Sequence, residues 1–366
     1  MSVFHTRPGL RWLVPTSVAV AIVGGGVAVG TFAAAAEPDL PERSAAQLLV
    51  DLQTARLDGL TGTVLQRADL GLPTVPGVGE RGGAGLSALL SGTHTIRVWY
   101  AGPDRARVAV LGTLGETDVI RNGSDVWVWN SQTKHAQHTT LPGRTGAPEH
   151  KPAELRMTPQ EAAEAALAAI DPSTQVRVGR STTVADRDAY ELVLDPRDGA
   201  SLVDEVRIAV DAVEHVPLAV KVFATGRDKP AFELAFTQVD FNRPDPTRFV
   251  FNPPPGTRVT EEAAPEPGTA ARAWTERLRT VGQGWTTVLV AQAPQLDRAT
   301  AGQPDGGDSA APLGRLLNQL PEVSGEWGSG RLVRGDLFNV LLTDDGRVLV
   351  GAVTPERLYE VAGTTR

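Results

Sequence analysis

The side chains best suited to bind a metal ion are three histidines near the middle of the chain. His135 and His138 lie three residues apart in a segment with strand-like alternation, and His150 follows them. Residues three apart in a strand point to opposite faces of a sheet, so His135 and His138 would not converge on one ion. We expect surface histidines and no metal site.

A glycine-rich stretch gives a literal match to a dinucleotide-binding fingerprint, because residues 77–82 read G-V-G-E-R-G. That fingerprint holds a pyrophosphate only between a strand and the N-terminus of a helix. Pro73 and Pro76 interrupt the approach to this stretch. Gly83 and Gly85 interrupt the exit. We therefore expect no nucleotide site here.

Composition and charge narrow the classes of function further. The chain has 366 residues and no cysteine, which excludes disulfides, thiol catalysis and lipid attachment through an N-terminal cysteine. Its net charge is −8, and Arg7 and Arg11 are the only charged residues among the first 36, so the remainder carries −10. Binding of nucleic acid is disfavoured. The carboxylate pairs at 204–205 and 344–345 fall in turns or strand starts, so we expect no enzyme and no cofactor.

Three tryptophans stand out in a chain with 5% aromatic residues. Trp99, Trp127 and Trp129 fall in neighbouring predicted strands, and Trp127 and Trp129, two residues apart, share one sheet face. They either pack as core residues or line an apolar cavity. A pocket walled by apolar groups without charges would suit acyl chains.

The N-terminal region predicts export. Residues 13–36 contain no charged side chain, and this run is long enough to span a membrane. It ends in small residues that also suit cleavage near Ala36. Arg7 and Arg11 precede this run, so either outcome leaves the body of the protein outside the cytoplasm, anchored to the cytoplasmic membrane through residues 13–36 or released.

Two helices are expected in the exported part. Residues 44–58 begin with a Ser44–Gln47 capping box and carry leucines, among them Leu49 and Leu52, on one face. Residues 158–170 begin with a second box and are rich in alanine, with Leu167 and Ile170 as their large apolar side chains. An alanine-rich helix packs closely or leaves space beneath it.

Around these helices the apolar pattern alternates with a period of two, and about ten such segments, separated by turn signals, predict one large antiparallel sheet. Residues 71–92 interrupt this regularity. They are rich in glycine and proline but contain Leu86, Leu89 and Leu90, which makes the segment too apolar for a simple linker.

Residues 261–268 are predicted to be a linker and residues 269–366 a small α+β domain. Within that domain we expect helices at 269–280 and 313–320, and strands at 285–291, 332–333, 337–342 and 348–353. The last two strands are joined by a tight turn at 344–346. The chain thus divides into 1–36, a domain at 37–260, the linker and the C-terminal domain.

Four stretches resemble known proteins. Residues 119–130 (VIRNGSDVWVWN) look like a hairpin of the LolA-like lipoprotein carriers and of the sigma-factor regulator RseB (MucB). Residues 236–242 and 249–259 (FVFNPPPGTRV) resemble their closing strands, and residues 348–358 are similar to the end of the second domain of RseB. The resemblance implies an α+β fold in which an unclosed antiparallel β-barrel covers helices around a hydrophobic cavity.

From this resemblance we expect an exported, non-enzymatic protein that binds a lipid or a lipoprotein acyl chain. The alternative is an RseB/MucB-like regulator that binds a transmembrane anti-sigma factor. The cavity would have the tryptophan-bearing face as its wall, the helices as its cover and the leucines of 71–92 as a movable lid. Its expected lining is Leu49, Leu52, Val64, Leu86, Leu89, Leu90, Trp99, Trp127, Trp129, Leu167 and Ile170.

Overall fold

The computed structural model describes residues 38–72, 89, 91–112, 115–141, 172–263, 278–292 and 320–365. The expected helices at 158–170 and 313–320 and the apolar run at 13–36 therefore lie outside the described residues, apart from Leu320. The same holds for most of 71–92, and with it for Leu86 and Leu90, and for Leu167 and Ile170.

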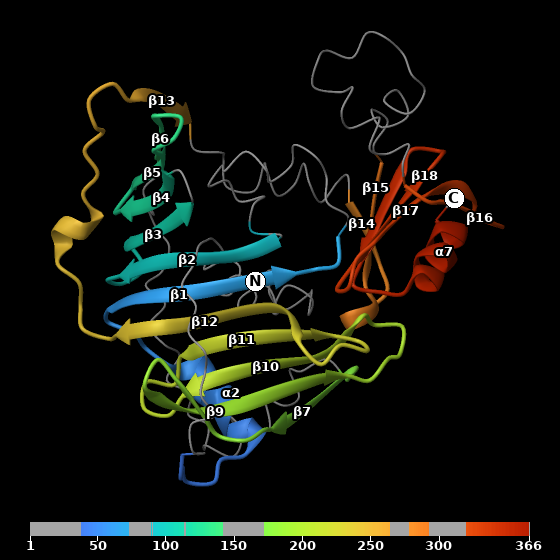
Figure 1. Cartoon of the computed structure of the whole chain (residues 1–366), viewed down its shortest axis with the longest axis horizontal. Coiled ribbons are helices and arrows are strands. Elements are labelled where there is room, and N and C mark those ends of the chain that lie inside the picture. The colour runs from blue at the N-terminus through green and yellow to red at the C-terminus, as the bar shows by residue number, and fades with distance from the viewer. Residues whose placement is uncertain are drawn as a thin grey trace, which may run out of the picture.

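Within the described part, thirteen strands form one large sheet (Figure 1). Its strands are β1 (Leu60–Asp69), β2 (Ser91–Tyr100), β3 (Arg105–Gly112), β4 (Gly115–Asn122), β5 (Asp125–Asn130), β6 (His135–Thr140), β7 (Thr174–Val178), β8 (Thr182–Val184), β9 (Arg187–Pro196), β10 (Val203–Asp211), β11 (Pro217–Ala224), β12 (Pro230–Asp240) and β13 (Arg258–Ala263). The order is β13-β6-β5-β4-β3-β2-β1-β12-β11-β10-β9-β7, and β8 pairs with β9. The two ends of this order do not pair, so the sheet is unclosed, as the resemblance implies.

One pairing departs from the expected antiparallel meander. β13 runs parallel to β6, with Arg258 opposite His135 and Ala263 opposite Thr140. The chain reaches this edge from β12 through a long excursion that contains the short 3-10 helix η4 (Pro246–Phe249), visible as the gold segment of Figure 1. The strand therefore includes Glu261, where the sequence predicts a linker. Every β13 side chain is exposed, so the segment has no apolar alternation that could have predicted it.

Helix α2 (Ala45–Thr54) begins as predicted. The Ser44 hydroxyl accepts from the Gln47 backbone N–H, and the Gln47 side chain accepts from the Ser44 N–H. The helix ends before residue 58, because Leu57 packs against a different cluster, the one around Val64. Leu48 is fully buried against Leu192 and its neighbours in β9.

The register gives the large sheet two faces with different chemistry. Leu192, Ile208, Val220, Leu234 and Gln66 are successive cross-strand partners, and Leu192 packs under α2. We call the face that carries these residues, and with them Val64, the inner face. The other, outer face carries ion pairs in the same strands, such as Arg67 with Glu233 at 3.2 Å. In these strands, the side chains that pack against α2 therefore lie on the inner face.

A second, six-stranded sheet lies within the described C-terminal residues. Its strands are β14 (Leu278–Val281), β15 (Val288–Gln292), β16 (Glu322–Gly325), β17 (Gly328–Arg334), β18 (Asn339–Thr343) and β19 (Arg347–Gly351), in the order β14-β15-β19-β18-β17-β16. Helix α7 (Pro355–Thr364) buries Leu358 and Val361 on one face of this sheet (Figure 1). The turn predicted between β18 and β19 is present, and Gly346 there has a φ of 82°.

Two expectations for this part are wrong. Leu278 begins β14 and pairs with Ala291, so the predicted helix at 269–280 does not extend over its last residues. Trp285 lies in the short 3-10 helix η5 (Gly284–Thr286), and strand β15 starts only at Val288. At Leu278, pairing with β15 overrides the local helical pattern. Helix α7 itself was not predicted.

Backbone and side-chain contacts join the two sheets. Ser201 and Val353 form an isolated β-bridge, flanked by a hydrogen bond of 2.9 Å from the Leu202 N–H to the Ala352 carbonyl. Arg227 forms ion pairs with Asp69 of β1 and with Asp336 of the loop between β17 and β18. The two sheets are thus tied at several independent points.

Candidate functional site

A row of four valines crosses the large sheet on its inner face. Val98, Val108, Val119 and Val128 are successive register partners in strands β2 to β5. Val98 lies opposite Gly62, two residues from Val64, which places the row on the same face as α2. Burial weakens along the row, from 8% exposure at Val98 to 38% at Val119. We call these residues the valine row. They present an apolar surface that is only partly covered.

Three of the predicted cavity residues share this face. Val64 is fully buried in β1, and Leu49 and Leu52 of α2 pack around the cluster of Leu48 and Leu192. These three residues thus line the same side of the sheet as the valine row. The valine row was not predicted from the sequence. Its signal was present, however, because valines alternate in strands β3 and β5.

The three tryptophans lie on the outer face instead. Trp99 and Trp127 belong to one row of cross-strand partners. In this row Trp99 pairs with Arg107, Arg107 with Ile120, and Ile120 with Trp127. Trp99 is three residues from Ile96, the partner of Val64, so the tryptophans point away from Val64 and α2. The expected single wall is thus divided between two faces, although Trp127 and Trp129 do share one, as predicted.

The segment that follows η4 covers these tryptophans. The Phe251 ring lies 5.2 Å from Trp127 and 5.9 Å from Trp129 between ring centroids, and Trp129 is buried. Beside them Arg107 pairs with the buried Asp118 at 2.9 Å and lies over the Trp99 ring. Charged side chains in the tryptophan rows are the signal that could have assigned these rows to the outer face, because charges are costly inside an apolar cavity.

Leu89, the described member of the leucine-bearing segment, is buried beside the inner face. Its carbonyl accepts a hydrogen bond of 3.0 Å from Nε2 of Gln66 in β1. Gln66 is fully buried as well. This hydrogen bond joins Leu89 to the face that carries Val64.

His138 has more partners than a surface histidine. Its side chain is 17% exposed and lies between Glu261 of β13 and Asp125 of β5. His135 points to the opposite face, as predicted, and its Nε2 lies 3.0 Å from the Thr260 hydroxyl. Among the residues that the structure describes, no group of three potential ligands could hold a metal ion. We interpret the His138 cluster as structural.

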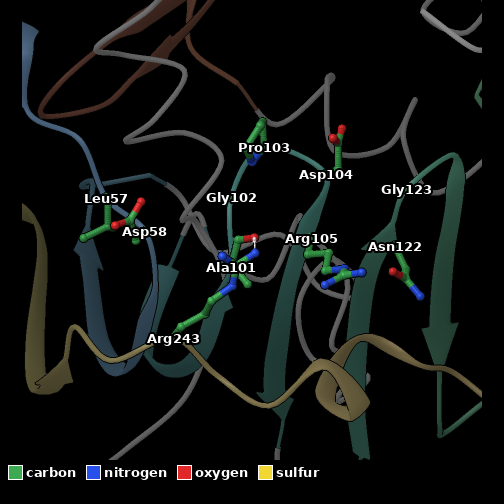
Figure 2. A pocket seen from close by; sticks show the side chains of 10 residues that line it. All are labelled: Leu57, Asp58, Ala101, Gly102, Pro103, Asp104, Arg105, Asn122, Gly123 and Arg243. Atoms are coloured by element: carbon green, nitrogen blue, oxygen red, sulfur yellow. Dashed lines mark hydrogen bonds between the residues drawn. The ribbon is translucent and has the colours of Figure 1, made fainter.

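A hollow of about 520 Å³ opens where the turns after β2 and β4 meet residues 57 and 58 (Figure 2). Asp104 there pairs with Arg121 at 3.1 Å, and Arg243 donates to the Ala101 carbonyl at 3.3 Å. Arg105 and Asn122, a register pair on the outer face, complete its polar side. Its charged lining does not suit an acyl chain, so we place no lipid there.

No family model and no curated protein matches this sequence. Among solved structures, MucB in the Pseudomonas aeruginosa MucA/MucB complex is 15% identical, with a TM-score of 0.42 over 87% of this chain and 96% of that chain. A LolA-superfamily protein from Nitrosomonas europaea is 13% identical, with a TM-score of 0.21 over 57% of this chain and 99% of that chain.

The chain is similar in structure to MucB and to LolA-superfamily proteins. The large unclosed sheet and the small second sheet are consistent with a fold of this kind. Nothing in the described ranges forms a helix that is both long and apolar enough to cross a bilayer.

Proposed function

We propose that this chain is an exported, non-enzymatic protein that binds a lipid or an acyl chain on the inner face of its large sheet. Residues 13–36 would anchor it to the cytoplasmic membrane or be removed near Ala36. The observation that carries the proposal is the valine row. It continues the packed surface of Val64 and α2, but its own side chains become more exposed toward β4 and β5.

The energetics support an apolar ligand at this place. Covering the exposed part of a valine contributes roughly 0.5 to 1 kcal/mol, and Val119, which is 38% exposed, has the partly exposed Val108 and Val128 as its cross-strand neighbours. An acyl chain is long, flexible and without charge, and it can follow cross-strand neighbours that lie about 5 Å apart. Leu49 and Leu52 of α2 would add apolar contacts, and so would Leu89.

The test is native mass spectrometry of residues 37–366, exported from a lipid-rich bacterial host, with lipid extraction of the same sample. We expect one bound lipid per chain. Val119→Asp should lower the bound fraction at least tenfold, because a carboxylate cannot be desolvated against an acyl chain. Val213→Asp is the matched control, since Val213 is 71% exposed in a turn. An empty wild-type protein, or equal occupancy in both variants, would contradict the proposal.

A second candidate function is regulation through a membrane-spanning partner such as an anti-sigma factor. It is favoured by a second apolar row, Leu289, Val350, Val340 and Val333, on the face of the small sheet opposite α7. Leu289 is 42% exposed. A pull-down from host membranes should recover such a protein with the wild-type chain and lose it with Leu289→Asp. Recovery of no membrane-spanning protein would exclude this candidate.

A further inference from the structure

Gln66 places a polar side chain on the inner face of the large sheet. It lies in the middle of β1, between its register partners Leu234 of β12 and His94 of β2. The residue is 0% exposed. A buried amide must satisfy its hydrogen-bonding atoms inside the protein, because water does not reach them.

The orientation of this amide follows from its partner. The Leu89 carbonyl can only accept, so the amide nitrogen Nε2 must face it, at 3.0 Å. The oxygen Oε1 therefore points elsewhere, and it has no hydrogen-bond partner among the described residues. A buried acceptor without a donor is costly and rare in folded proteins. A ligand that brings a donor would remove that cost.

The position of Gln66 relative to the valine row suits an amphipathic molecule. Gln66 is four residues along β1 from Gly62, which lies opposite Val98 at one end of the row. At about 3.3 Å per residue, this separation is about 13 Å on one face of the sheet. A lipid whose chain covers the valine row can therefore place a polar group near Gln66.

We propose that Gln66 Oε1 accepts a hydrogen bond from the polar end of the bound lipid, which makes Gln66 a determinant of ligand class. This inference rests on the function proposed above. The ligand would carry a hydroxyl or an amide N–H, as in an acylglycerol or an N-acylated lipid. Esters without a donor bind more weakly. Ionised fatty acids do so as well, because their carboxylate meets an acceptor.

The experiment compares probes that share one oleoyl chain. Methyl oleate has no donor, 1-monooleoylglycerol has hydroxyls, and N-methyl oleamide has an amide N–H. We expect the wild-type chain to bind at least one of the two donor-bearing probes about fivefold more tightly than methyl oleate, as one neutral hydrogen bond allows. Whichever of the two donor-bearing probes binds more tightly shows whether the Gln66 oxygen prefers a hydroxyl or an amide N–H as its donor.

The variant Gln66→Met keeps the side-chain length and removes both polar atoms. It should bind all three probes with the affinity that the wild type has for methyl oleate. Gln238→Met, an exposed position on β12, should keep the wild-type preference. The comparison within the wild type does not depend on how well the Gln66 variant folds.

The outcomes separate this inference from the proposed function. Equal affinity of the wild type for all three probes would overturn the role of Gln66 and leave lipid binding in place. A preference that survives in Gln66→Met would do the same. If the wild type binds none of the probes and carries no lipid, the proposed function fails and this inference fails with it.

Discussion

The imidazole of His138 is stacked on the indole of Trp127, with ring centroids 4.2 Å apart and planes 19° apart. Its Nδ1 lies 2.8 Å from Glu261 and its Nε2 lies 3.1 Å from Asp125. Both ring nitrogens can donate to these carboxylates only when the imidazole is protonated. The side chain of His138 thereby joins β5, β6 and the parallel edge strand β13.

The stability that His138 contributes should depend on pH. Burial lowers the pKa of His138, but hydrogen bonds and attraction from Glu261 and Asp125 raise it more, so the net pKa lies above 6.5. A raised folded-state pKa means that the contribution is complete below about pH 6.5 and disappears as pH rises through the folded pKa.

The measurement is thermal unfolding of the wild type and His138→Gln between pH 5.5 and 8.5. The difference in Tm should be largest at the acidic end. His135→Gln is the control, because His135 contacts a hydroxyl and not a carboxylate. A His138 difference that stays constant across this range would contradict the expected titration.

Trp127→Ala should separate stability from lipid binding. The indole contacts Phe251 and His138 on the outer face, so its loss should lower the free energy of unfolding by about 2 kcal/mol. Lipid occupancy should stay unchanged, because the valine row lies on the other face. Urea unfolding and native mass spectrometry of the same preparation check both parts. Loss of lipid from a folded Trp127 variant would place the ligand on the tryptophan side.

Asp211 should be among the most sensitive charged residues. Its side chain is 1% exposed, pairs with Arg187 and accepts the backbone N–H groups of Val213 and Glu214 at 2.9 and 2.7 Å. Burial raises the pKa of Asp211, but Arg187 and the two N–H groups lower it more, to a net value below 3.8. Asp211→Asn should cost about 3 kcal/mol at pH 7.

The sign of the pH effect follows from the lowered pKa. The contribution of Asp211 is present above pH 3.8 and is lost as pH falls through the folded pKa. Urea unfolding at pH 7 and at successively lower pH should therefore show a narrowing difference between the wild type and Asp211→Asn. The control Asp104→Asn, at a 66% exposed side chain, should change stability by less than about 0.5 kcal/mol. If Asp211→Asn and Asp104→Asn lowered the free energy of unfolding equally, the proposed sensitivity of Asp211 would be refuted.

Gly71→Ala should loosen the junction between the two sheets. Gly71 has a φ of 62°, and an added Cβ would collide with the carboxylate of Asp336, which pairs with Arg227. Gly123 has a similar φ of 65° with open space around it, so Gly123→Ala has the same backbone strain without the collision.

Hydrogen exchange at the Asp336 amide, which donates to the Leu70 carbonyl at 2.7 Å, reports on this junction. We expect faster exchange at this amide in Gly71→Ala only. We also expect Gly71→Ala to be less stable than Gly123→Ala by about 1 kcal/mol. Equal exchange in the two variants would mean that Asp336 moves aside without affecting the junction.

Local chemistry was sufficient to predict several features of this protein from its sequence. The Ser44 capping box, the tight turn at Gly346 and the alternation of strands β2 to β5 depend on residues close together in the chain. Their preferences therefore survive folding. The resemblance of residues 119–130 and 249–259 to LolA-like proteins added the unclosed sheet, which local pattern alone does not specify.

Tertiary structure decided which side of the sheet is the inside. Trp127 and Val128 are both apolar, so alternation shows that they face opposite sides but not which side meets α2. Register across distant strands and the cover supplied by Phe251 make that choice. Tertiary structure also decided β13, since this short polar segment forms a strand only because β6, from elsewhere in the chain, satisfies its backbone hydrogen bonds.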